Sequence, residues 1–429
     1  MMLVGFSFKN FASFYNEAIF TMMACKKDEF RDFNTFSTSH GDLLKSALIY
    51  GPNGSGKTNW IKALYFMKRM VIGSISGNKL INMCENFKFQ EKAYSEPTSF
   101  EISFIKDDIL FDYGFEVLNN QINREWLYKK KKRKIPIFTR EGSDWKEIKL
   151  YSDMKKAEKI KNFTRKDALF LTAAAMFNIG MAKDIQDWFE NLSIFMGDHT
   201  SPVLTANYIS NSKINKEKAL RYLNIADIGI EDFEILVEEV DIEDIVSIGD
   251  SIKENISRGE LKINNKPKLN AKIREYDLVT KHNIYNEHGE VVGDTELSFV
   301  EYQSQGTIKF FELLGPILEA LEKGKVVVID EVDARLHCAI VAYLISLFNS
   351  IDKNPGNGQL ICNTHNVLLL EENIRRDQIW FVQKDKYMGS ELYCLDDFKE
   401  VRKNDPKLKK YLLGVYGAIP KMDGSDFFE

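Results

Sequence analysis

The chain has 429 residues, of which 44% are hydrophobic and 28% are charged, and its formal net charge is −5 at pH 7. This composition is that of a folded protein and excludes a mainly disordered chain, and the length predicts two or three subdomains rather than one compact core. The negative charge argues against a surface that binds nucleic acid throughout, so any contact with DNA would be a local patch.

The N-terminal segment predicts two strands, LVGFSFKNFASF and EAIFTMMA, joined by a turn within residues 10–16. It has no cationic leader, and polar residues interrupt its apolar run, which favours a strand over a signal peptide. No apolar run reaches the roughly 18 residues of a membrane span. The five cysteines are scattered without a CxxC pair, which indicates reduced thiols and no structural zinc. We therefore expect a cytoplasmic protein that does not enter a membrane.

Residues 51–58, GPNGSGKT, lie between a short apolar strand, SALIYG, and a segment with helical spacing of apolar residues, KTNWIKALYFMKRMV. This is the P-loop pattern, in which glycines let backbone N–H groups surround a β-phosphate at the positive end of a helix. Lys57 is expected to reach the β- and γ-phosphate oxygens, and Thr58 to coordinate Mg²⁺. The sequence thus predicts ATP and Mg²⁺ as ligands of a loop made of Asn53, Gly54, Ser55, Gly56, Lys57 and Thr58.

The middle of the chain changes its pattern twice. From about residue 87 to 148, short alternating runs predict an antiparallel sheet. Six consecutive cations at residues 129–134 fall between two of these strands, where a solvated hairpin turn is favoured over a contact with a phosphate backbone. Residues 152–221 favour helices, which predicts an inserted helical subdomain. Strand patterns return at residues 271–285 and 289–299.

The C-terminal part carries three further elements that suit a nucleotide site. An apolar strand ends in Asp330 and Glu331, where Asp330 can hold the water shell of Mg²⁺ and Glu331 can polarise an attacking water. Upstream, the turn at residues 304–307, Ser-Gln-Gly-Thr, opens an amphipathic helix. Its small and hydroxylated residues leave backbone donors for an anion, although an ordinary helix cap has the same appearance. The strand QLICN leads to His365, which fits a histidine in contact with the γ-phosphate.

Taken together, these motifs resemble ABC-type P-loop ATPases of the chromosome-maintenance (SMC) and overcoming-lysogenization-defect (OLD) lineage. They resemble more closely the AAA-family ATPases of abortive infection, of the RloA/AbiLi-like type. The matching segments cover roughly residues 1–150 and 270–420 and read FKNFASF, GPNGSGKTN, SQGT, VVIDEVDARLH, ICNTH, RRDQIWFVQKD and YLLGVYGAIP.

The resemblance implies an α/β fold: an ABC-type ATPase head built from both chain ends, with an antiparallel β subdomain and an inserted helical subdomain. We accordingly expect an N-terminal ATPase lobe at residues 1–150 and a helical insertion at residues 151–235. A C-terminal ATPase lobe with the signature, the acidic pair and the switch histidine would occupy residues 236–429.

The resemblance also implies roles for single residues. Two ATP molecules would lie between two protomers, and the signature of one protomer would cap the γ-phosphate held by the other; its residues are Ser304, Gly306 and Thr307. Asp333 would lie in the loop that meets the partner. Glu331 and His365 would be the catalytic residues. Gln90, in FKFQEK, is the candidate for the glutamine that links Mg²⁺ to the signature, beside Thr58 and Asp330 as metal ligands.

Two functions are compatible with this pattern. The first is a sensor or scaffold ATPase of a bacterial anti-phage system, with slow hydrolysis, a homodimeric or higher even-numbered assembly, and a separate toxin or nuclease as partner. It leaves room for a trigger derived from the phage. The alternative is an SMC/RecF-like DNA-maintenance clamp. The acidic composition and the short helical insertion argue mildly against that alternative.

Overall fold

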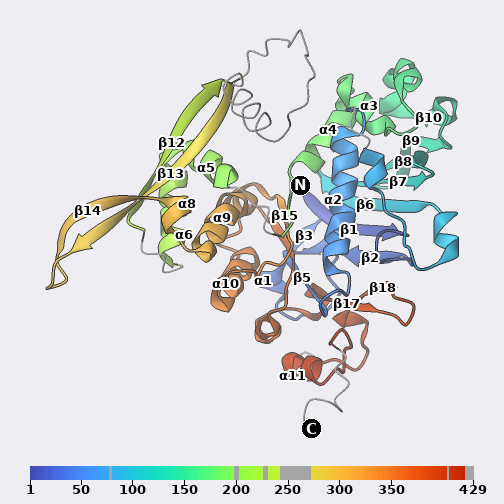
Figure 1. Cartoon of the computed structure of the whole chain (residues 1–429). Coiled ribbons are helices and arrows are strands. Elements are labelled where there is room, and N and C mark those ends of the chain that lie inside the picture. The colour runs from blue at the N-terminus through green and yellow to red at the C-terminus, as the bar shows by residue number, and fades with distance from the viewer. Residues whose placement is uncertain (77–79, 198–201, 226–229, 242–271, 403–404, 421–429) are drawn as a thin grey trace, which may run out of the picture. The chain divides into compact units, whose positions relative to one another are not determined.

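The computed structural model describes the whole chain except residues 77–79, 198–201, 226–229, 242–271, 403–404 and 421–429 (Figure 1). The chain divides into unit 1, Met1–Thr200 with Ile317–Glu429, and unit 2, Ser201–Pro316. The helical insertion expected at residues 151–235 is therefore divided between the two units.

A six-stranded sheet forms the centre of unit 1. Five of its strands run parallel, and the sixth, β18, pairs antiparallel with β17. Strand β5, from the N-terminal part of the chain, lies between β16 and β17, from the C-terminal part, so both ends of the chain build one sheet. In spatial order the strands are β11 (Leu192–Phe195), β15 (Val326–Ile329), β16 (Gln359–Asn363), β5 (Ser46–Tyr50), β17 (Ile379–Lys384) and β18 (Ser390–Cys394).

Strand β11 lies within residues 152–221, a stretch whose sequence favours helices, and it was not predicted. Its four residues pair in parallel with β15, from Leu192 opposite Val326 to Phe195 opposite Ile329. A run this short between helices gives almost no periodic signal. Its strand conformation depends on the edge that β15 offers, which only the folded sheet provides.

The second sheet of unit 1 has seven antiparallel strands and confirms the sheet expected in residues 87–148. The basic run at residues 129–134 lies at the β8–β9 hairpin, as expected. Lys129 pairs there with Asp153, and Lys134 pairs with Asp112. In spatial order the strands are β10 (Ile148–Leu150), β9 (Lys134–Glu141), β8 (Gln121–Lys130), β7 (Ile109–Leu118), β6 (Thr98–Lys106), β1 (Met2–Lys9) and β2 (Ala18–Thr21).

Helix α2 (Lys57–Gly73) joins the two sheets through one continuous core. Its Trp60 is fully buried and packs edge-on against Phe6 of β1 and Phe20 of β2. Its Phe66 packs against Phe100 of β6, and Ile49 of β5 belongs to the same core. Removing apolar surface from water stabilises a fold by about 25 cal/mol per Å². Burial of this apolar face therefore fixes the helix that follows the P-loop.

The remaining elements of unit 1 are short. A two-stranded ribbon joins β3 (Thr35–Thr38) and β4 (Gly41–Leu44). The other α-helices are α1 (Arg31–Asn34), α3 (Phe170–Met176), α4 (Gly180–Glu190), α10 (Cys338–Asn349) and α11 (Lys407–Leu412). The 3₁₀ turns are η1 (Leu80–Met83), η2 (Glu91–Tyr94), η3 (Trp145–Glu147), η4 (Ser152–Phe163), η5 (Val367–Glu371), η6 (Arg376–Gln378) and η7 (Leu395–Asp397).

Unit 2 contains a three-stranded antiparallel sheet and helices, and the boundary with unit 1 falls inside α9. Because Pro316 has no N–H, it cannot bond the Glu312 carbonyl one turn earlier. The hydroxyl of Thr205 lies 3.1 Å from that carbonyl and 2.6 Å from the carbonyl of Phe311, so its proton is shared between the two acceptors. The elements are β12 (Asp232–Asp241), β13 (Lys272–Tyr285), β14 (Val291–Ser298), α5 (Pro202–Ser210), α6 (Lys213–Ile225), α8 (Phe299–Tyr302) and α9 (Gln305–Lys323). Within the described ranges, none of the helices has the length and apolarity that a membrane span requires.

The C-terminal motif YLLGVYGAIP packs on the central sheet next to the P-loop strand. The ring of Tyr411 stacks on Phe381 of β17 at 5.5 Å and lies 6.0 Å from the ring of Tyr50 of β5. The hydroxyl of Tyr411 donates to the carbonyl of Ala418 at 2.8 Å. The motif therefore has a structural role in covering the end of the sheet.

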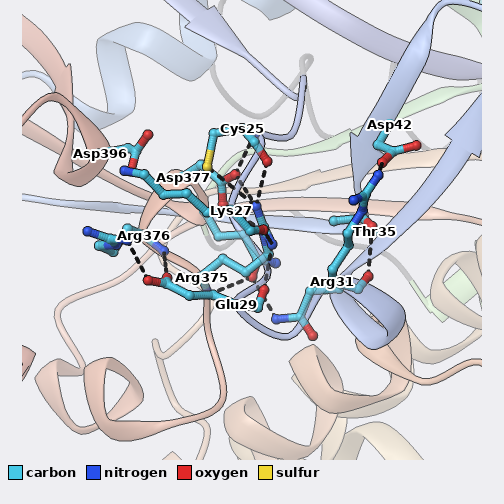
Figure 2. Close-up of polar contacts among 12 residues, drawn as sticks. Cys25, Lys27, Glu29, Arg31, Thr35, Asp42, Arg375, Arg376, Asp377 and Asp396 are labelled. Atoms are coloured by element: carbon cyan, nitrogen blue, oxygen red, sulfur yellow. Dashed lines mark hydrogen bonds and ion pairs between the residues drawn. The ribbon is translucent and has the colours of Figure 1, made fainter. Parts of the chain in front are cut away.

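The motif RRDQ forms a buried polar cluster that ties residues 25–29 to the start of β17 (Figure 2). Arg375 is 1% exposed, and its guanidinium donates to both carboxylate oxygens of Asp377, at 2.9 and 2.7 Å. It also donates to the carbonyls of Lys27 (2.9 Å) and Cys25 (3.1 Å). Five donors in a rigid fork can satisfy this many acceptors at once.

We expect Arg375→Met to destabilise unit 1 by about 3–5 kcal/mol, because it leaves the Asp377 carboxylate buried without its partner. Arg31→Met is a matched control, since Arg31 is 54% exposed and pairs with Asp42 on the surface (Figure 2). Its loss should cost about 0–1 kcal/mol. Urea unfolding of both variants measures the difference, and equal losses would contradict the assigned role of Arg375.

Candidate functional site

The P-loop joins the buried strand β5 to α2 and lies tightly against the β17–β18 hairpin. A Cβ atom on Gly51 would lie 2.3 Å from the carbonyl oxygen of Val382, and one on Gly56 would lie 2.4 Å from the hydroxyl of Ser390. Gly56 also has a φ of 116°, in the left-handed region that favours glycine. These glycines let the loop fit its place, while residues 53–54 at its tip are exposed.

Two buried polar groups inside the loop suit an anionic ligand. The Lys57 ammonium donates to the carbonyl oxygens of Gly51 (2.7 Å) and Pro52 (3.2 Å). Burial lowers the pKa of Lys57, and three nearby carboxylates oppose this shift. The hydroxyl of Ser55 is buried and has no hydrogen-bond partner among the described residues. A phosphate group would supply an acceptor for both donors.

The fold brings the carboxylate of Asp330, directly after β15, to Thr58 in the first turn of α2. The Thr58 hydroxyl donates to Asp330 Oδ1 at 3.2 Å, although the two residues are 272 positions apart. The Asp330 N–H donates to the carbonyl of Phe195 at 2.8 Å, so the unexpected strand β11 helps to hold this end of β15. Mg²⁺ commonly takes one or two protein oxygens beside phosphate oxygens and waters. Thr58 and Asp330 therefore fit the metal role predicted for them.

Glu331 lies in an exposed turn with a left-handed backbone, at a φ of 52°. Its N–H donates to the side-chain oxygen of Asn363, whose amide nitrogen donates to the carboxylate of Asp330. Asn363 ends β16 and is fully buried. This residue was not predicted from the sequence. The sequence held one signal that could have indicated it: a polar residue follows the apolar residues LIC at the end of the strand QLICN.

The structure also brings His365 and Asp333 together. The main-chain N–H of His365 donates to the two carboxylate oxygens of Asp333 at 3.0 and 3.3 Å. Burial and the cation of Lys57 lower the pKa of His365, while Asp333 and Glu331 oppose the shift. The lowered pKa favours the neutral imidazole, which has one nitrogen as donor and the other as acceptor. Such a ring can donate to a phosphate oxygen.

Unit 1 has one cavity at the P-loop and another along α2. The first, of ≈ 570 Å³, is lined by Asn53 and His365 and by the C-terminal segment, including Tyr411. The second, of ≈ 500 Å³, is lined by Asn59 and Lys62 in the first two turns of α2. Open space thus lies beside the tip of the loop and along the helix that follows it.

The predicted signature residues belong to unit 2 and are described there alone. The hydroxyl of Ser304 accepts the N–H of Thr307 at 3.1 Å and lies 2.9 Å from the Thr307 hydroxyl. Ser304 thus caps α9 as an ordinary N-cap does. Ser304 is exposed, and Gly306 and Thr307 are half-buried. Their role across a dimer stays a prediction.

Gln90, the predicted link to Mg²⁺, precedes η2 and is half-buried. Its carbonyl accepts the N–H of Ala93 at 3.1 Å. None of the contacts among the described residues joins its side chain to Thr58 or Asp330. Its metal role likewise stays a prediction.

A P-loop after one parallel strand and an acidic pair after a nearby strand of the same sheet define the class of P-loop nucleoside triphosphatases. A family model described as "AAA domain, putative AbiEii toxin, Type IV TA system" matches residues 46–192 and 199–371. The chain belongs to this family of AAA-domain ATPases. No curated protein matches its sequence.

Proposed function

We propose that this chain is the ATP-hydrolysing sensor or scaffold subunit of a cytoplasmic bacterial anti-phage system of the abortive-infection type, related to the RloA/AbiLi-like and OLD ATPases. Its ATP-bound dimer would control a separate toxin or nuclease. The observation that carries the ATPase assignment is the Thr58–Asp330 contact at 3.2 Å. The family's description, which names a toxin and a toxin–antitoxin system, supports the assignment to defence.

In the proposed reaction the P-loop amides and Lys57 hold the β- and γ-phosphates. Thr58 and Asp330 would hold Mg²⁺, which would neutralise phosphate charge when bound. Glu331 accepts a proton from the attacking water, and neutral His365 donates to an oxygen of the γ-phosphate.

The dimer part of the proposal assigns the second half of each site to the partner. The exposed N-terminus of α9, with Ser304, Gly306 and Thr307, would cap the γ-phosphate held by the other protomer, since free N–H groups at a helix start favour an anion. Asp333, bonded to the His365 N–H, would lie at the surface facing the partner. The assembly would then be a homodimer or a higher even-numbered oligomer.

Mixing two inactive variants should restore hydrolysis if each site is shared between protomers. Lys57→Ala removes the phosphate lysine, and Ser304→Arg blocks the signature turn, so each pure dimer has two defective sites. A mixed dimer has one intact site, and an equal mixture should recover about a quarter of the parental rate by random pairing. Phosphate release after mixing and refolding together measures this. A mixture as inactive as its components would contradict the shared site.

Affinity purification of tagged Glu331→Gln chain from its native host in Mg-ATP, with half of the sample treated with nuclease, tests the defence assignment. We expect a stoichiometric toxin or nuclease that survives this treatment and is lost from the Lys57→Ala control. Association only with nuclease-sensitive DNA and repair proteins would instead support an SMC/RecF-like clamp.

A further inference from the structure

One buried side chain contacts both acidic residues of the site. Asn363 is 0% exposed, and its amide nitrogen donates to Asp330 Oδ1 while its amide oxygen accepts the N–H of Glu331. Its main-chain carbonyl accepts the N–H of Val332 at 3.2 Å. A single residue thus bonds three consecutive residues of the turn after β15.

The turn needs such support because of its backbone. Glu331 has a φ of 52°, and a residue with a Cβ atom is strained in this left-handed region. Glycine would adopt it without strain but would provide no carboxylate. The bonds from Asn363 to the main chain on both sides of the Glu331 Cα atom hold the conformation that places this exposed carboxylate at the edge of the sheet.

The second contact reaches the metal side of the site. Asp330 Oδ1 accepts from Asn363 and also from the hydroxyl of Thr58. The orientation of the carboxylate that faces Thr58 is therefore set by the same amide that sets the Glu331 backbone. Groups that orient metal ligands and bases in this way have large effects without touching substrate.

Another buried asparagine shows what a purely structural role looks like. Asn354 is 1% exposed, and its side chain bonds only main-chain groups, namely the carbonyls of Phe348 and Gly358 and the N–H of Gly358. It closes a loop between α10 and β16. Asn363, in contrast, directs its amide nitrogen at a carboxylate of the candidate site.

We propose that Asn363 is a positioning residue that couples the metal-facing carboxylate of Asp330 to the placement of the Glu331 base. The proposal rests on the proposed ATPase function of this site. Asn363 does not contact substrate in this scheme. Its loss should act on the chemical step through Glu331 and on the metal through Asp330, while the P-loop keeps its hold on the phosphates.

The test uses full-length Asn363→Ala, with Asn354→Ala as the matched control and Asn363→Ser as a milder variant. The single hydroxyl of Ser cannot reach both partners. We expect both Asn363 variants to lower kcat about 10- to 100-fold and to leave the Kd for mant-ATP in EDTA unchanged. The affinity gained on adding Mg²⁺ should shrink. Asn354→Ala should lower Tm and leave kcat and the Mg²⁺ effect at parental values.

A second readout asks whether Asn363 acts through Glu331. In a Glu331→Gln background and at saturating Mg²⁺, where the route through Asp330 no longer limits the rate, Asn363→Ala should reduce turnover no further, because residues that act as a unit are not additive. Full additivity, a parental kcat for both Asn363 variants, or an equal loss of kcat in Asn354→Ala would overturn the proposal. If the parental chain hydrolyses no ATP, the proposed function fails. The effect of Mg²⁺ on mant-ATP affinity then still tests whether Asn363 acts on the metal through Asp330.

Discussion

Glu331→Gln should bind ATP as the parental chain does and lose about 10²- to 10⁴-fold in turnover, the usual contribution of a general base. Gln has nearly the same shape, and the main-chain bond of residue 331 to Asn363 does not depend on its side chain. The substitution therefore removes the proton acceptor and leaves the turn in place. Phosphate release at saturating ATP, together with the Kd for mant-ATP, separates turnover from binding.

The control for this variant is Glu371→Gln, at an exposed glutamate that ends η5 outside the acidic turn. It should hydrolyse ATP at the parental rate. In the dimer scheme, Glu331→Gln should also accumulate the ATP-bound assembly, seen by light scattering as a species of at least twice the 49.6 kDa protomer mass. A parental rate in Glu331→Gln would remove Glu331 from its assigned role.

Lys57→Ala should weaken the binding of Mg-ATP. Lys57 is buried in the loop, with its ammonium held by the carbonyls of Gly51 and Pro52, so its contacts with phosphate would be shielded from water. Charged hydrogen bonds contribute about 1.5–3 kcal/mol each, so loss of one or two predicts a rise in Kd of at least about tenfold. Calorimetric titration with Mg-ATP measures it.

The matched control is Lys88→Ala, since the Lys88 side chain is 67% exposed and pairs with Glu85 on the surface. It removes the same charge from the protein, and its Kd should equal the parental value. A Lys57→Ala chain that binds Mg-ATP as tightly as Lys88→Ala would show that the loop does not hold the phosphates.

Local sequence patterns were sufficient to predict the central residues of the candidate site. The strand, the glycine loop and the helix around Lys57 are adjacent in the chain, and so are the buried strand and the acidic pair at Asp330. Each pattern has a physical requirement within about a dozen residues, namely a buried apolar strand followed by a polar turn at its carboxyl end. Because these strands are parallel, their carboxyl ends meet at one edge of the sheet, and Thr58 and Asp330 meet there.

Contacts between distant segments could not be predicted in this way. Strand β11 exists because β15 offers it an edge, and the buried cluster around Arg375 forms because residues 25–29 return to the start of β17. The helical insertion expected at residues 151–235 is divided between the two units for the same reason. Contacts between residues, rather than a helical sequence pattern, decide which unit a segment joins.

Thus the sequence by itself determined the class of ligand and the principal residues that would hold it, because phosphate binding requires a contiguous loop at the start of a helix. Only the tertiary structure decided how the acidic turn is supported. The left-handed backbone of Glu331 and its bond to Asn363 join positions that are 32 residues apart. No local pattern specifies such a partner, since a buried asparagine acquires its role only from the groups that packing brings within hydrogen-bond distance.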